Sequence, residues 1–267
     1  MLRWLVRVAS LMALAVCLMP HPASADSVTA VGTGSGPNSG LSATAVFTTL
    51  SGGQLQVTLT NSATSSALNP SMILTGVFFT LSGVTLTPVS ATIGSGSTIL
   101  FATSNCATGS PCNSSVTNLG GEWGYGSGLG FPLGAAMGIS STGSVSGLGA
   151  SNFNGPNLWQ PNNGALDGLQ GGIAPLAGTV GGNAAVTGNN ALISDTIVFV
   201  LSGLPSGYTL SGNISNINFQ YGTSLSEPNL PCTSGSACTP VPEPGTLALF
   251  GTGLLGLAGI IRRRMAA

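Results

Sequence analysis

The positively charged side chains of this chain are confined to its two ends, which limits what the rest of it can bind or catalyse. The sequence has no lysine, and its basic residues are Arg3, Arg7, His21, Arg262, Arg263 and Arg264. Between Asp26 and Val241 the charged side chains are all carboxylates, which give this body a charge of about −5 at pH 7. Such a body cannot neutralise a nucleic-acid backbone or clamp phosphates. It also lacks the imidazole of Ser-His and Cys-His catalysis.

The first 25 residues have the three parts of a secretory signal peptide. A positive start is followed by an apolar run over residues 8–19 and by an A-x-A cleavage site. We therefore expect signal peptidase to cut after residue 25, with Ala23, Ala25 and Asp26 at the cleavage site. An uncleaved anchor is disfavoured because the run is shorter than the ~20 residues of a spanning helix and ends at Pro20 and Pro22.

A lipoprotein signal is a second alternative for the same segment. Residues 14–17, Leu-Ala-Val-Cys, approach a lipobox. Bulky Val16 stands directly before Cys17, where a small residue is expected, so simple cleavage and export is favoured.

The C-terminal segment has the features of a second targeting signal. Prolines surround Glu243, an apolar run covers residues 247–261, and three arginines follow. Residues 247–261 would span only ~22 Å as a helix, but local thinning and snorkelling can relieve the mismatch with a ~30 Å hydrocarbon core. We expect a transmembrane helix over 246–261, with Arg262, Arg263 and Arg264 as a cytoplasmic stop and the body outside. The alternative is a buried helix, for which a triple-arginine end is unusual.

Residues 241–264 resemble a known family of sorting tails. Val241-Pro242-Glu243-Pro244, the Leu/Gly-rich run and the arginine cluster occur in the order of the PEP-CTERM sorting domain, with Gly245 as a small departure. The resemblance implies that Pro242, Glu243 and Pro244 are the recognition signal of an exosortase, a membrane-embedded, transpeptidase-like enzyme. It also implies that the helix holds the precursor in the membrane until the tail is removed.

The exported body, residues 26–239, has the pattern of an all-β domain. Residues 54–61 alternate apolar and polar side chains, which predicts a half-buried strand. Further strands are predicted over residues 43–49, 73–81, 84–93, 97–102, 196–201, 208–210 and 214–221. Sustained helical periodicity is absent from the body sequence. We therefore expect an antiparallel β-sandwich or jelly-roll-like domain.

The middle of the body, about residues 105–190, is different. It contains about half of the 41 glycines and has few strand patterns. Long loops without their own structure are uncommon unless they are functional. We expect a Gly-rich insertion over the sandwich, with short strands near Ile139 and Val145 as an alternative. A disordered linker is disfavoured because aromatic residues are interspersed throughout.

The body has four cysteines, in two pairs of equal spacing. An even number in an exported protein favours disulfides over free thiols. Three pairings are possible, and the matched spacing favours Cys106–Cys112 and Cys232–Cys238. A metal site is not expected, because neither histidine nor clustered carboxylates accompany these cysteines.

A few carboxylates and aromatic side chains of the middle segment are the candidates for catalysis or sugar binding. A glycosidase needs two carboxylates at a set separation and aromatic platforms, and Glu122 and Asp167 are the best candidates. They show no spacing signal, so we expect neither an enzyme nor a cofactor. Non-catalytic sugar contact through Trp123, Tyr125 and Trp159 is the second hypothesis, and it requires these side chains to be exposed. The first hypothesis is a structural surface or matrix protein associated with exopolysaccharide.

Overall fold

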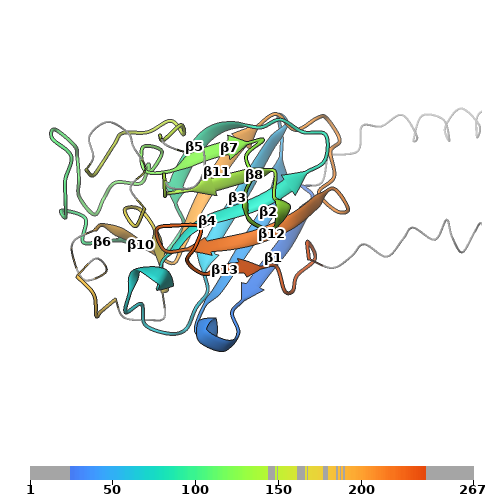
Figure 1. Ribbon diagram of the computed structural model, residues 1–267. Coiled ribbons are helices and arrows are strands. Elements are labelled where there is room, and N and C mark those ends of the chain that lie inside the picture. The colour runs from blue at the N-terminus through green and yellow to red at the C-terminus, as the bar shows by residue number, and fades with distance from the viewer. Residues whose placement is uncertain are drawn as a thin grey trace, which may run out of the picture.

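The described part of the molecule consists of two β-sheets packed face to face, with loops and three short 3-10 turns (Figure 1). The computed structural model describes residues 25–143, 148, 150–160, 166, 168–176, 180–184, 186, 188 and 190–238. Within them, the prediction of an all-β fold is confirmed. The signal peptide up to Ser24, the strand near Val145, and the sorting tail with its helix lie outside the described residues, so these stay predictions, as do the domain limits.

The first sheet is antiparallel throughout, and its strand order is β1-β2-β3-β11-β5. Its strands are β1 (Ser27–Thr33), β2 (Ser42–Leu50), β3 (Gln54–Asn61), β11 (Thr196–Ser202) and β5 (Thr87–Ile93). In β3, Leu55, Val57 and Leu59 are buried while the residues between them are partly exposed. The alternation seen in the sequence therefore sets which face of the sheet meets the core.

The second sheet runs in the order β13-β12-β4-β9-β10-β6, with β8 also paired to β4 and β7 paired to β8. All its pairs are antiparallel except β9–β10. Its strands are β4 (Leu74–Leu81), β6 (Ile99–Leu100), β7 (Gly124–Ser127), β8 (Met137–Ser140), β9 (Ile173–Ala174), β10 (Leu192–Ser194), β12 (Ile214–Tyr221) and β13 (Asn229–Pro231). Three of these strands, β7, β8 and β9, come from the Gly-rich insertion.

Two of the predicted strands differ in the structure. Residues 208–210 form a loop, because the N–H of Leu210 is taken by the side-chain carboxylate of Asp26 rather than by a neighbouring strand. The strand predicted over 97–102 shortens to β6, since the next residue, Phe101, has a positive φ of 55° that ends the extended backbone. The first strand, β1, was not predicted.

The main core lies between the two sheets. Phe47 of β2 meets Phe79 of β4 edge-on, with ring centroids 5.1 Å apart. Phe199 of β11 and Phe219 of β12 are fully buried in the same cluster. Aromatic side chains from both sheets therefore fill the space between them and fix their face-to-face packing.

The Gly-rich insertion adds a third layer and closes one end of the sandwich. On the outer face of the second sheet, Phe78 stacks on Phe131 at 4.9 Å, and Leu148 and Leu166 belong to the same cluster. At the sandwich end, Trp123 packs on Phe199 of the first sheet. The prediction of an insertion over the sandwich is thus confirmed for its described part, as is the short strand at Ile139.

The C-terminal end of the described chain covers the edge of the first sheet. A disulfide between Cys232 and Cys238 closes a loop, residues 232–238, which we call the clasp. Its backbone pairs with β1: the N–H of Val31 donates to the carbonyl of Ser234 at 2.7 Å, and the N–H of Ala237 donates to the carbonyl of Thr29 at 2.9 Å. The clasp thereby shields strand hydrogen-bonding groups that would otherwise pair with another chain.

Two other strand edges are covered in different ways. At β5, the N–H of Ile93 donates to the carbonyl of Thr117, and the N–H of Leu119 donates to the carbonyl of Ala91. At β7, the side-chain amide of Asn152 replaces a strand, because it both accepts from the N–H of Tyr125 and donates to its carbonyl. These contacts pair the backbone N–H and C=O groups of the strand edges within the molecule, so these groups do not pair with another chain.

Candidate functional site

The three aromatic residues proposed as sugar contacts are core residues. Trp123 is 0% exposed, Trp159 is 1% exposed and Tyr125 is 6% exposed. Burial also raises the pKa of the Tyr125 hydroxyl. A sugar ring cannot stack on a side chain that protein atoms already cover, so this part of the sequence interpretation was wrong. Aromatic residues beside glycine give no signal that separates an exposed platform from a core anchor.

Each tryptophan instead fastens one loop of the insertion. The indole N–H of Trp123 donates to the carbonyl of Gly171 at 3.1 Å. The indole N–H of Trp159 donates to the carbonyl of Ala102 at 2.8 Å. Both rings therefore combine apolar burial with a satisfied polar atom, the usual condition for a tryptophan in a core.

Glu122 occupies the centre of these contacts. Its side chain is buried, and Oε1 accepts the N–H of Leu158 at 2.6 Å and the N–H of Trp159 at 3.2 Å. Asp167, its proposed partner in catalysis, lies outside the described residues. The observed contacts give Glu122 a structural task, which is to satisfy two backbone donors in the segment that carries Trp159.

Other carboxylates of the body are bound in the same way. Glu227 accepts the N–H of Ser224 at 3.0 Å and also takes the N–H of Thr223. The carboxylate of Asp26 takes the N–H of Leu210. In a body that has no side-chain cation, backbone N–H groups replace the missing salt-bridge partners of these anions.

The glycines of the insertion permit backbones to touch. A Cβ added to Gly121 would lie 1.9 Å from the carbonyl oxygen of Pro156, and one added to Gly120 would lie 2.5 Å from the backbone of Asn154. These contacts join residues 120–121 to residues 154–156 of the insertion, next to Glu122. Only glycine lets the two backbones approach this closely at these positions. Close backbone packing therefore explains part of the glycine content of the insertion.

Both predicted disulfides are confirmed. Cys106 and Cys112 are joined with their Cα atoms 5.9 Å apart, and Cys232 and Cys238 with theirs 5.6 Å apart. The loop of the first disulfide contacts the same backbone that Glu122 binds. The N–H of Ala107, within this loop, donates to the carbonyl of Leu158 at 3.0 Å, and the N–H of Leu158 donates to Glu122. Each disulfide pins a local loop. In the described part of the chain, no group of three His, Cys, Asp or Glu side chains could hold a metal ion.

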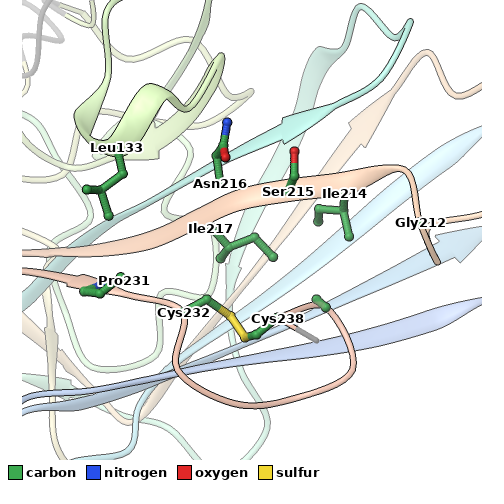
Figure 2. Close-up of a pocket in the computed structure, with 10 residues that line it drawn as sticks. Leu133, Gly212, Ile214, Ser215, Asn216, Ile217, Pro231, Cys232 and Cys238 are labelled. Atoms are coloured by element: carbon green, nitrogen blue, oxygen red, sulfur yellow. A yellow bond between two sulfur atoms is a disulfide. The ribbon is translucent and has the colours of Figure 1, made fainter. Parts of the chain in front are cut away.

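A groove of about 500 Å³ lies beside the clasp, and the sequence did not predict it. Figure 2 shows Ile214 and Ile217 of β12 on its floor, with the Cys232–Cys238 disulfide on one side and Leu133 on the other. The side chain of Asn216 donates to the carbonyl of Gly134 at 3.0 Å. None of the ten residues that line this groove carries a charge, so its geometry offers a mixed apolar and amide surface without an acid, base or nucleophilic pair.

The comparison with known families places a targeting signal directly after the clasp. Residues 240–264 match the PEP-CTERM protein-sorting motif. The chain thus carries the motif that defines exported proteins sorted by an exosortase from a membrane-anchored precursor. Pro242, Glu243, Pro244, Arg262, Arg263 and Arg264 all fall inside the matched residues.

The body itself gives no further identification. No curated protein and no solved structure matches the chain. Among the residues that the structure describes, no helix is long and apolar enough to cross a membrane. The expected helix over 246–261 lies outside those residues.

Proposed function

We propose that the protein is a structural component of the cell surface, associated with exopolysaccharide after an exosortase has processed its tail, and that it is not an enzyme. The observation that carries the proposal is the sorting motif at residues 240–264, which follows a body with a signal-like N-terminus. The architecture supports a structural role. The candidate catalytic and sugar-contact residues that lie in the described part of the chain are packing residues, and the carboxylates serve backbone donors.

The charge of the body supports the same role. It is anionic and free of side-chain cations, so it does not attract the acidic groups of nucleic acids or phospholipids. Covered strand edges at β1, β5 and β7 favour a body that stays folded and separate at high local concentration. A matrix protein must avoid binding nucleic acids and phospholipids, and it must not aggregate at high local concentration.

Changing the Pro242-Glu243-Pro244 triplet to alanines tests the sorting step. We expect a membrane-retained form that keeps its tail, because the exosortase has lost its recognition signal. Intact mass and cell fractionation in the native host measure this. Pro240→Ala is the matched control, since it removes a neighbouring proline outside the triplet, and it should be processed normally. Unchanged mass and location of the triple variant would contradict exosortase sorting.

Loss of exopolysaccharide tests the structural association. In a host strain that makes no exopolysaccharide, we expect the processed protein to move from the cell surface to the medium, because its attachment partner is absent. Quantitative immunoblotting of surface and medium fractions measures the shift. An equal surface fraction in both strains would exclude exopolysaccharide as the partner while leaving the sorting step intact.

A further inference from the structure

The processed protein has a single primary amine. The sequence contains no lysine, so once the signal peptide is cut after Ala25 the only amine is the α-amino group of Asp26. The same group is the only cation that the body between Asp26 and Val241 acquires. Its position therefore decides both the amine chemistry of the mature protein and the location of the one positive charge of the body.

The structure holds the nitrogen of Asp26 against the first sheet. The backbone nitrogen of Asp26 donates to Oγ1 of Thr49 at 2.9 Å, and the carbonyl of Asp26 accepts the backbone N–H of Thr49 at 2.8 Å. The hydroxyl of Thr49 also donates to that carbonyl, at 3.4 Å. Asp26 is thus paired with β2 before β1 begins.

The side chain of Asp26 fixes the residue on its other side. Its carboxylate accepts the N–H of Leu210, in the loop between β11 and β12. Asp26 and Thr49 also line a pocket of about 320 Å³, between the β2–β3 turn at Gly52 and the loop at Tyr208. Backbone and side-chain contacts together place the nitrogen at the wall of this pocket.

We propose that the α-ammonium group released at Asp26 is bound in the fold on the Thr49 hydroxyl, so that the single amine of the mature protein is an engaged structural group rather than a free end. This proposal rests on the export and cleavage proposed above. Cleavage converts an amide N–H donor into an ammonium donor at the same atom, and a charged donor forms the stronger hydrogen bond. The negative charge of the body acts in the same direction.

Amine acylation of the mature protein recovered from its host tests this. The protein is treated at pH 8 with an N-hydroxysuccinimide ester of acetate, and the acetyl adduct is located and followed by mass spectrometry. Because only an unprotonated, accessible amine reacts, we expect the native protein to be acylated at Asp26 about tenfold more slowly than the protein in 8 M urea, in line with one hydrogen bond to a charged group. Equal rates in the two conditions would overturn the proposal.

Thr49→Val assigns the protection to the hydroxyl. This variant keeps the shape of the side chain and removes its oxygen, so the native rate should rise most of the way to the rate in urea. Thr44→Val, on the same strand, is the matched control and should keep the slow rate. Tryptophan fluorescence confirms that both variants are folded. A folded Thr49→Val protein with unchanged protection would overturn the proposal.

The intact mass separates this proposal from the one on which it rests. If the mature chain begins at another residue, its α-amino group is not that of Asp26, and the proposal of a bound ammonium group is wrong. The C-terminal peptide, identified separately after proteolysis, reports the sorting step independently.

Discussion

Gly121→Ala is expected to lower the free energy of unfolding by about 3 kcal/mol or more. The new methyl group would lie 1.9 Å from the carbonyl oxygen of Pro156 and 2.3 Å from its carbonyl carbon, so the backbone of one of two packed loops must move. Overpacking that shifts side chains and backbone costs about 1–3 kcal/mol, occasionally more, and the closeness of this contact places Gly121→Ala at the upper end. Urea unfolding of the protein recovered from its host, followed by tryptophan fluorescence, measures the loss.

Gly130→Ala is the matched control for this prediction. Gly130 lies in the same insertion, its φ is not positive, and a Cβ there would meet nothing within 4 Å. We expect its unfolding midpoint to stay close to that of the unchanged protein, since surface substitutions are usually within about 0.5 kcal/mol. If the two alanine variants unfold at the same urea concentration, the insertion is not held by close backbone contact.

Glu122→Ala is expected to cost about 3 kcal/mol by a different route. It leaves the buried N–H groups of Leu158 and Trp159 without this acceptor, and a lost partner costs roughly 1–3 kcal/mol for each buried group. Glu122→Gln keeps an oxygen acceptor without the charge, so it should lose only about 1 kcal/mol. The same unfolding measurement separates the two variants.

Glu227→Ala removes a half-buried carboxylate and is the comparison for the loss of the buried carboxylate of Glu122. Glu227 also accepts backbone N–H groups, at Thr223 and Ser224, but it is only half-buried. Water can replace its oxygens, so the loss should stay below about 1 kcal/mol. An alanine at residue 122 that is no more destabilising than the alanine at 227 would show that Glu122 is not the anchor of its loop.

The sequence predicts the bounds of two inner strands, β3 and β12, at the observed residues. In β3 every second side chain is buried, as its alternating pattern indicates, whereas the last five residues of β12 are all buried, because both of its faces are covered. β1 was missed because its buried side chains include only Val28 and a small alanine, Ala30. β1 pairs with β2 along its whole length, and its other edge is covered by the clasp, about 200 residues further along the chain.

The insertion shows why the candidate site was only partly predictable. β9, in the insertion, has two residues, and β10, just after it, has three, too few for any periodic pattern to identify. Trp123 and Trp159 are buried against distant segments, where their indole N–H groups donate to the carbonyls of Gly171 and Ala102. A local sequence pattern does not predict such distant contacts. The sorting motif, in contrast, is read directly from consecutive residues, and the disulfide pairs follow from short, equal spacing.

The clasp also determines how mechanical tension enters the body while the precursor is held in a membrane. The sorting motif begins two residues after Cys238, so a pull on the tail arrives at that cysteine. The disulfide transmits part of the force straight to Cys232 and β13 in the second sheet, and hydrogen bonds from residues 234 and 237 transmit the rest to β1 in the first. Both sheets share the tension, and peeling β1 away does not by itself release the attachment to β13.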